Sequence, residues 1–292
     1  MSLDHLKGAA RHAVLLTPED RIEFILAERW IGYSAATRVL TELDDLVDHP
    51  RNLRMPCLAV IGDPNNGKTM LLERCIKRHP LRERGNEVSH VAVLLFETPS
   101  EPDEGRLYSQ ILVALRVAHR PDAPPEKLLA KILERFSELG IRLLMADEFH
   151  NMLNGSAAHQ RQFLASLKSL INTLRVSFVV AGTDDIIRAL ATDNQFITRF
   201  EKVKLPRWGM NQETRNFLVS IESTLPLAEP STMSDLPSLM RAIVEGGANT
   251  VGGITKVVKK SAIAAIKNGK EKITQDIVDK VVKELREREV TA

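Results

Sequence analysis

The stretch Gly62-Asp63-Pro64-Asn65-Asn66-Gly67-Lys68-Thr69 decides the fold, because it fits the pattern GxxxxGK[ST] at every defined position. The apolar run Cys57–Ile61 before it predicts a buried strand, and the amphipathic stretch from Met70 to Lys77 predicts a helix. In such a unit the glycines let the backbone N–H groups face phosphate oxygens, and the helix N-terminus adds favourable partial charge. A chance match in an ordinary loop is the alternative, and the two flanking patterns argue against it.

The loop residues have distinct expected roles in binding a nucleoside triphosphate. Residues 62–67 and Met70 would surround the phosphates with backbone groups. Lys68 would reach the β- and γ-phosphates, and the hydroxyl of Thr69 would be a Mg²⁺ ligand. The expected cofactors are therefore ATP and Mg²⁺.

Two acidic residues, Asp147 and Glu148, end the apolar run 141–146, which predicts a further strand. In a parallel sheet, ligands bind beyond the carboxyl ends of the strands. Asp147 would hold Mg²⁺, and Glu148 would polarise the water that attacks the γ-phosphorus. A solvated strand end is the alternative. A strand, 90–96, and two helices separate this pair from the phosphate loop, so the two strands are not expected to be neighbours.

Two later polar residues complete the candidate catalytic set. Thr183 follows the predicted strand 176–181 and could bond the attacking water or the γ-phosphate, with a simple turn as the alternative. Arg199 precedes a predicted short strand, 202–205, and is a candidate arginine finger. A finger donated to a neighbouring subunit requires an oligomer. A surface arginine is the alternative, and Arg188 is the competing candidate.

Strands alternate with helices from 57 to 205, which predicts a parallel sheet with both faces covered. Before this region, Thr17-Pro18 begins a helix that extends to about Trp30, and Ser34 can cap a second helix that ends near Pro50. After Pro206 only helices are expected. We therefore expect three parts: an N-terminal helical extension (1–50), an α/β P-loop ATPase core (51–208) and a helical lid (209–292).

Composition limits the class of protein. The chain has 292 residues, with 40 Lys and Arg against 38 Asp and Glu. This balance excludes a polybasic protein, so an anionic partner must meet a local patch. Cys57 and Cys75 have no CxxC spacing, which argues against a disulfide framework. No apolar run is long enough to span a membrane, and the first ten residues lack the apolar run of a signal peptide. The expected location is the cytoplasm.

Taken together, these residues resemble an AAA+ ATPase, and more narrowly TniB, a transposition helper ATPase related to TnsC and more distantly to MuB. The local resemblance lies in Arg29-Trp30-Ile31-Gly32-Tyr33, Asp48-His49-Pro50-Arg51, Arg54-Met55-Pro56 and the phosphate loop. It extends over nearly the whole chain and is most specific over 17–72.

The resemblance implies further nucleotide contacts. Ile31 and Tyr33 match the segment that packs on the adenine in AAA+ proteins, with ordinary core packing as the alternative. The lid of such proteins usually brings an arginine to the γ-phosphate. The matching stretch here, 252–256, has no arginine, and Lys256 is the only nearby substitute.

The resemblance also implies a function. Such helpers bind duplex DNA without sequence preference when loaded with ATP, and they assemble on it as a ring or helical filament of identical subunits. They recruit a separate DDE transposase, TniA-like here, and a TniQ-like target-recognition factor is a further possible partner. Arg106 and Lys127 occupy places comparable to DNA contacts in relatives and would act through phosphate charge, although a solvated helix-face charge is the favoured interpretation for each one taken alone. The chain lacks an RNase-H-like acidic triad, so it is not expected to cut DNA.

Three other functions fit the phosphate loop. The main alternative is an AAA+ helicase loader or replication-type remodelling ATPase. A small-molecule kinase or GTPase is disfavoured because there is no Asn-Lys-x-Asp motif and because the Asp147-Glu148 pair favours water as the nucleophile. A nucleotide-driven signalling switch usually carries long repeat extensions, which this sequence lacks.

Overall fold

A computed structural model describes residues 3–79, 82–84, 87–90 and 92–290. The chain divides into two compact units. The sheet unit comprises Ala35–Pro64 and Lys68–Leu205, and the helical unit comprises Met1–Ser34, Asn65–Gly67 and Pro206–Ala292. The three domains predicted from the sequence, with boundaries after residues 50 and 208, remain a prediction.

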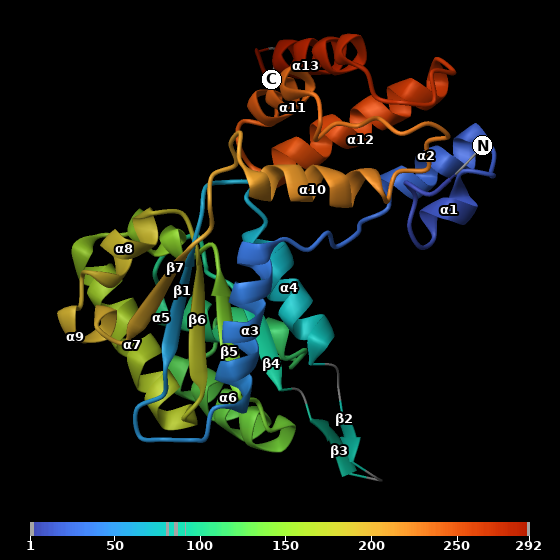
Figure 1. Cartoon of the computed structure of the whole chain (residues 1–292). Coiled ribbons are helices and arrows are strands. Elements are labelled where there is room, and N and C mark those ends of the chain that lie inside the picture. The colour runs from blue at the N-terminus through green and yellow to red at the C-terminus, as the bar shows by residue number, and fades with distance from the viewer. Residues whose placement is uncertain (1–2, 80–81, 85–86, 91, 291–292) are drawn as a thin grey trace. The chain divides into compact units, whose positions relative to one another are not determined.

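The sheet unit is built on a five-stranded parallel sheet with the order β4-β5-β6-β1-β7 (Figure 1). Its strands are β1 (Cys57–Ile61), β4 (Val93–Glu97), β5 (Leu143–Asp147), β6 (Ser177–Gly182) and β7 (Phe200–Lys204). The predicted parallel sheet is confirmed. Because β6 lies between β1 and β5, the phosphate-loop strand and the carboxylate strand are not neighbours, as the sequence predicts.

Helices cover the sheet because its central strands are apolar on both faces. Every residue of β1, β5 and β6 is buried. Alternate residues such as Ala59 and Val180 join a large apolar cluster with the helices on one face. On the other face, α4 packs against β4, β5 and β6. The helices of this unit are α3 (Ser34–Asp48), α4 (Lys68–Arg78), α5 (Glu104–Ala114), α6 (Pro125–Leu139), α7 (Ala157–Leu174), α8 (Asp185–Leu190) and α9 (Asn194–Ile197).

Three elements of the sheet unit differ from the sequence prediction. The strand expected over 90–96 begins at Val93, because His90 ends a separate antiparallel hairpin of β2 (Arg82–Arg84) and β3 (Glu87–His90). Residue 91 of that predicted strand lies outside the described residues. A 3₁₀ helix, η1 (Phe149–Asn154), follows the two acids, and β7 begins two residues earlier than predicted.

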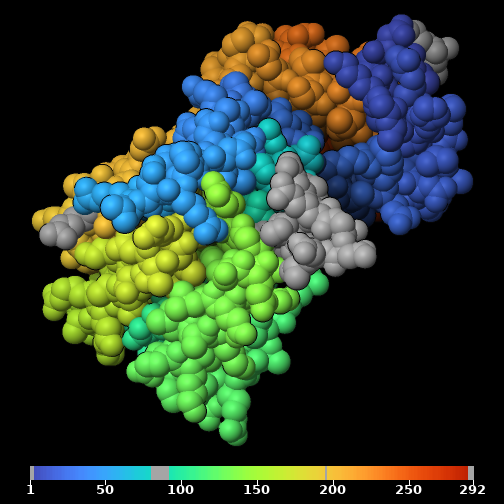
Figure 2. Space-filling model, turned by 90° about the horizontal axis from the view of Figure 1, so that it is seen from below, coloured from blue at the N-terminus to red at the C-terminus, as the bar shows by residue number. Residues whose placement is uncertain are grey.

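The amino edge of the sheet, where the strands begin, is closed by backbone segments. Ser177 Oγ donates to Leu46 O at 2.9 Å, and Arg142 donates to His49 O. Figure 2 looks onto this edge, and the light-blue segment between α3 and β1 lies across it beside the green α6. The opposite carboxyl edge carries the phosphate loop.

The helical unit contains α1 (Ala10–Ala13), α2 (Pro18–Leu26), α10 (Gln212–Glu222), α11 (Pro237–Gly246), α12 (Val251–Lys267) and α13 (Gln275–Val290). Thr17 caps α2 as predicted, since its side chain accepts from Asp20 N. The helix ends at Leu26, so its predicted extension to Trp30 is wrong: Ala27 already has extended backbone. A second apolar cluster joins α2 to α10–α13. None of the described helices combines the length and apolar character needed to cross a bilayer.

Candidate nucleotide-binding site

The phosphate loop leaves β1 at the carboxyl edge and turns through left-handed backbone at Asn65 and Gly67. The φ of Gly67 is 80°, which glycine adopts without steric cost. Asn66 is buried and fixes the loop centre: its Nδ2 donates to Pro206 O at 3.0 Å, and its Oδ1 accepts from Val251 N at 3.3 Å. Gly252 N also donates to Asn65 O at 3.0 Å. The loop is therefore held by backbone groups at the start of α12.

Lys68 lies in the first turn of α4 and folds back onto its own loop. Its Nζ donates to Gly62 O and Asp63 O, both at 2.9 Å, and only 6% of the residue is exposed. Burial lowers the pKa of Lys68, while the nearby Glu148, Asp147 and Asp63 carboxylates oppose that shift. An ammonium group held only by neutral carbonyls is available to a more strongly charged partner, such as a phosphate.

The structure brings Thr69, Asp147 and Glu148 together at the carboxyl edge. Thr69 Oγ1 donates to Asp147 Oδ2 at 2.6 Å, and Glu148 N donates to Asp147 Oδ1 at 2.8 Å. A hydroxyl beside a carboxylate is a pair of hard oxygen ligands of the kind that Mg²⁺ binds. The residues present therefore fit the metal predicted for them. The Glu148 carboxylate lies 3.3 Å from His150 Nδ1 and is more exposed than that of Asp147.

Two buried hydroxyl groups at this edge lack a hydrogen-bond partner among the described residues: Thr98 Oγ1 and Thr183 Oγ1. Thr183 follows β6, and Thr98 follows β4. An unbonded buried hydroxyl is costly unless a ligand or water completes it. Sequence reasoning missed Thr98, although a polar residue directly after an apolar strand is the signal that identified Thr183.

Arg199 lies apart from this group, at the amino edge. It directly precedes β7, which runs parallel to β1 with Phe200 opposite Cys57. A strand of this length spans roughly 15 Å, so Arg199 cannot reach the phosphate loop of its own chain. Its Nη1 donates to Asn172 Oδ1 at 2.8 Å. The competing Arg188 is exposed on α8 and pairs with Asp185 at 3.0 Å.

The predicted DNA contacts are exposed residues at the starts of two helices. Arg106 is in the first turn of α5 and pairs with Glu101 at 2.9 Å. Lys127 is in the first turn of α6. The Glu101 carboxylate partly neutralises the charge of Arg106.

Ile31, Tyr33 and Lys256 belong to the helical unit. Ile31 and Tyr33 pack on its apolar cluster, and the Tyr33 ring meets Trp208 edge-on with centroids 4.9 Å apart. Burial raises the pKa of Tyr33 to about 12. Part of each of these side chains is therefore packed in the core, as the alternative predicts. Their contact with adenine stays a prediction. Lys256 is exposed on α12.

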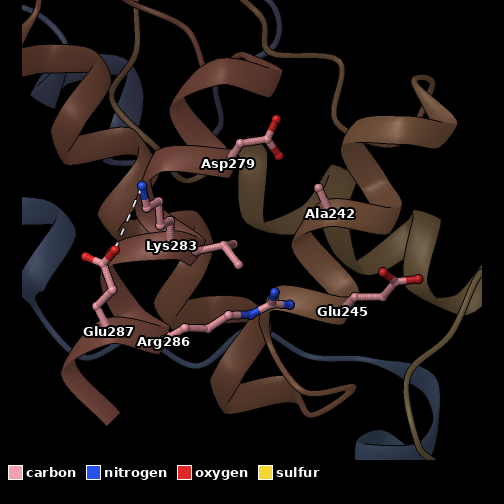
Figure 3. Close-up of a pocket in the computed structure, with 8 residues that line it drawn as sticks. Ala242, Glu245, Asp279, Lys283, Arg286 and Glu287 are labelled. Carbon is pink, nitrogen blue, oxygen red and sulfur yellow. Dashed lines mark ion pairs between the residues drawn. The ribbon is translucent and has the colours of Figure 1, made fainter. Parts of the chain in front are cut away.

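A cavity of about 380 Å³ in the helical unit contains none of the predicted site residues. It lies between α11 and α13 and is lined by side chains of both charges, including Glu245, Asp279 and Arg286 (Figure 3). Lys283 and Glu287 pair across one turn of α13 at 3.9 Å. The mixed charge argues against a triphosphate site here.

Comparison with known proteins agrees with this geometry. Residues 21–210 match the family described as Bacterial TniB protein. The chain belongs to the TniB family. TniB is a transposition-associated AAA+ ATPase family, so the resemblance seen in the sequence is confirmed. No curated protein matches this TniB chain in sequence.

Solved structures similar to this TniB chain show its fold. The Aeropyrum pernix ORC2 protein, in ADPNP and ADP complexes, is 18% identical, with a TM-score of 0.62 over 89% of this chain and 71% of that one. The Aeropyrum pernix ORC1 protein in complex with DNA is 13% identical, with a TM-score of 0.59 over 90% and 69%. A Walker-type ATPase of Pyrococcus abyssi is 13% identical, with a TM-score of 0.57 over 92% and 77%. The fold is therefore that of the AAA+ P-loop proteins, as predicted.

Proposed function

We propose that this TniB protein is a Mg²⁺-dependent ATPase that assembles as a homo-oligomer on double-stranded DNA and recruits a DDE transposase to it. One observation carries the chemistry: the phosphate loop, Lys68 and the Thr69–Asp147 pair meet at the carboxyl edge of a parallel sheet. The family carries the biological role, because TniB is associated with transposition. A solved protein of the same fold, the Aeropyrum pernix ORC1 protein, is in complex with DNA, which supports DNA as the partner.

In this proposal each residue of the edge has one task. Lys68 leaves the carbonyls of Gly62 and Asp63 and binds the β- and γ-phosphates, while the loop N–H groups hold the phosphate oxygens. Thr69 and Asp147 would hold Mg²⁺, which would supply positive charge beside the phosphate oxygens. Glu148 accepts a proton from the attacking water, and Thr183 orients that water or the γ-phosphate.

Residues outside this edge complete the proposed site. Arg199 is proposed to act on the nucleotide of a neighbouring subunit, because its own loop is out of reach. We also keep Ile31 and Tyr33 as proposed adenine contacts and Lys256 as the proposed lid residue. Arg106 and Lys127 are proposed to meet DNA phosphates.

The central test is DNA binding by the whole protein with ATP, with ADP and without nucleotide, for the unaltered chain and for Lys68→Ala. We expect tight binding only with ATP, and loss of that ATP effect in Lys68→Ala. Lys204→Ala is the matched control, because Lys204 is an exposed lysine that pairs with Asp184 at 2.8 Å. Equal DNA binding under all conditions would remove the proposal.

A salt titration tests the DNA contacts. Lys127→Gln should lower the slope of log affinity against log salt by about one unit, since one phosphate contact is lost. Lys131→Gln on the same helix is the control, because its Nζ already donates to Ala118 O at 2.9 Å. Co-purification of a helicase instead of a transposase would favour the loader function.

A further inference from the structure

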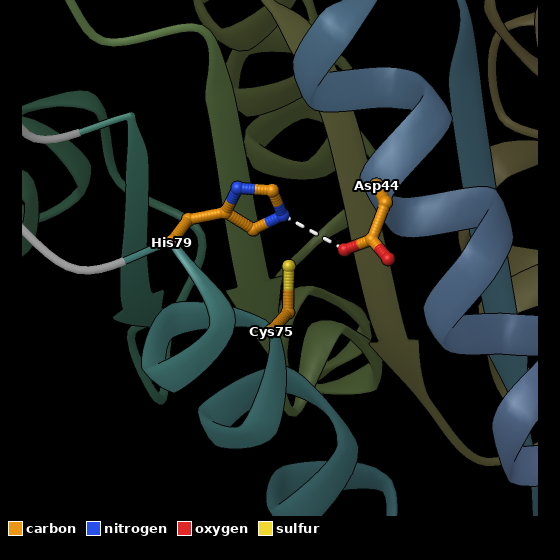
Figure 4. Close-up of side chains that lie close together, drawn as sticks. All are labelled: Asp44, Cys75 and His79. Atoms are coloured by element: carbon orange, nitrogen blue, oxygen red, sulfur yellow. Dashed lines mark hydrogen bonds and ion pairs between the residues drawn. The ribbon is translucent and has the colours of Figure 1, made fainter.

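A second cluster of ligand-type side chains lies in the sheet unit, away from the phosphate loop. It joins Asp44 of α3 to Cys75 and His79 at the end of α4 (Figure 4). One oxygen, one sulfur and one nitrogen of these residues all lie within 4.8 Å of one another. Since Cys75 is seven residues beyond Lys68 in the same helix, the cluster lies about 11 Å along the axis from the nucleotide residues.

The helix itself brings two of the three ligands together. Cys75 and His79 are four residues apart, and His79 N still donates to Cys75 O at 3.2 Å, so helical geometry continues to His79. Side chains at this spacing project from one face of a helix, one above the other. Asp44 faces them from α3 (Figure 4).

The contacts divide the Asp44 carboxylate between two partners. Arg78 Nη2 lies 2.6 Å from Asp44 Oδ2, and His79 Nε2 lies 2.7 Å from Asp44 Oδ1. The sulfur of Cys75 points toward the oxygen and nitrogen of that second pair (Figure 4). Cys75 is fully buried, whereas Asp44 and His79 are each partly exposed, so the cluster can be reached from solvent on one side.

We propose that Asp44, Cys75 and His79 form a zinc-binding site, with water as the fourth ligand. Zn²⁺ takes sulfur, imidazole nitrogen and carboxylate oxygen, whereas Mg²⁺ and Ca²⁺ prefer oxygen alone. Ligand atoms of a tetrahedral zinc site stand about 3.3–3.8 Å apart. On zinc binding, the distance between the Asp44 oxygen and the His79 nitrogen therefore increases slightly, and the Cys75 sulfur moves roughly an ångström closer to them. Rotation of the side chains is sufficient for both movements.

Binding changes the protonation of two ligand atoms, the Cys75 sulfur and the His79 Nε2. Burial raises the pKa of Cys75 to about 12, so the metal-free site holds a thiol. Zinc bonds the sulfur as a thiolate, and the thiol proton leaves to solvent. The proton that His79 Nε2 donates to Asp44 in the metal-free site also leaves that nitrogen for solvent, so that Nδ1 carries the N–H of the neutral ring and Nε2 binds the metal. Arg78 keeps its bond to the outer carboxylate oxygen and so orients Asp44. The metal would fasten α3 to the end of α4. This inference does not depend on the proposed function.

Cobalt titration of the chelator-treated full chain tests the site, because a cobalt–thiolate bond gives a charge-transfer absorption that nitrogen and oxygen ligands do not. We expect about one Co²⁺ per chain with this absorption, and its loss when Zn²⁺ is added. Cys75→Ser should abolish the absorption. Cys57→Ser is the matched control, because Cys57 is the other buried free cysteine, and it should keep the absorption.

Two outcomes would overturn the proposal. One is the absence of thiolate absorption in the unaltered protein, which would leave Asp44, Arg78 and His79 as a plain ion-pair network. The other is an absorption that persists in Cys75→Ser or disappears in Cys57→Ser. Should Cys75→Ser fail to fold, His79→Gln decides, because His79 is partly exposed. It should weaken Co²⁺ binding at least about tenfold, and unchanged affinity would refute the site.

Discussion

At the amino edge of the sheet, the hydroxyl of Ser177 donates to the carbonyl of Leu46 in the last turn of α3, and the guanidinium of Arg142 donates to the carbonyl of His49, directly after that helix. At the carboxyl edge, the buried hydroxyls of Thr98 and Thr183 have no partner among the described residues. Strand β6 thus begins with a hydroxyl that has a partner, Ser177, and is followed by one that has none, Thr183.

This difference at β6 favours the carboxyl edge as the proposed ligand-binding edge. A buried hydroxyl without a partner costs about 1–3 kcal/mol, so a fold keeps one where another molecule completes the bond. Lys68 supports the same interpretation. Its ammonium group donates to two loop carbonyls, and a charged phosphate is a stronger partner than a neutral carbonyl. At the amino edge, the Nε of Arg199 is a buried donor without a partner among the described residues.

The largest effect on ATP turnover is expected at Arg199. This residue lies at the amino edge, yet it has a proposed role in catalysis. Arg199→Ala should lower ATP turnover about 10³-fold while ATP binding stays unchanged, because an arginine finger acts on the transition state. Steady-state hydrolysis and nucleotide titration measure the two quantities. Arg188→Ala is the control and should retain turnover.

A mixing experiment shows which subunit Arg199 serves. Glu148→Gln subunits retain Arg199, so adding them to Arg199→Ala subunits should restore part of the lost turnover. Full activity of Arg199→Ala alone, or no recovery on mixing, would contradict a finger donated between subunits.

The next effect concerns the acid at the carboxyl edge. Glu148→Gln should reduce turnover by roughly 10²–10³-fold and leave ATP affinity unchanged, because the amide cannot accept the proton of the attacking water. Single-turnover hydrolysis is the measurement. Glu97→Gln is the matched control, since Glu97 ends the neighbouring strand and is opposite Asp147 in register. If Glu97→Gln were the more damaging change, the assignment of the base would be wrong.

Removing one hydroxyl at each end of β6 tests the difference between the two edges directly. Ser177→Ala should cost about 1 kcal/mol of unfolding free energy, because Leu46 O loses its donor, and activity should not change. Thr183→Val should leave stability unchanged and lower turnover about tenfold, the value of one neutral hydrogen bond in the transition state. Urea unfolding and ATP hydrolysis on both variants provide the four values. Equal losses of stability would show that the two edges do not differ.

The smallest effect is expected at Cys57, at the start of β1. Burial raises the pKa of this thiol to about 12, so it stays protonated at pH 8 and attacks alkylating reagents slowly. Mass spectrometry after iodoacetamide treatment should find Cys57 unmodified in the native protein and fully modified in urea. Rapid native modification would indicate that the amino edge opens.

The sequence predicts the sheet well because its strands are short apolar runs bounded by turn residues. β1 matches its predicted bounds, and β5 and β6 follow theirs to within two residues. The hairpin of β2 and β3 escapes prediction because Arg82–Arg84 and Glu87–His90 show no apolar alternation. The end of α2 is also missed, since the apolar spacing continues to Trp30 although the backbone does not.

The candidate site divides in the same way. Local pattern identifies the phosphate loop, Asp147 and Glu148, because each directly follows an apolar strand. The place of Arg199 at the amino edge depends on the register of β7 with β1, which no local pattern contains. The bond from Val251 to Asn66 joins residues 185 positions apart in sequence, and Gly252 donates to the neighbouring Asn65, so no local pattern predicts these contacts.

The backbone of Glu148 is left-handed, with φ 50° and ψ 39°, a conformation that costs a residue with a side chain about 1 kcal/mol or more. Asparagine or glycine would adopt it more easily. A laboratory selection for thermal stability alone should therefore enrich Gly or Asn at position 148. The selected variants should be more stable and should no longer hydrolyse ATP.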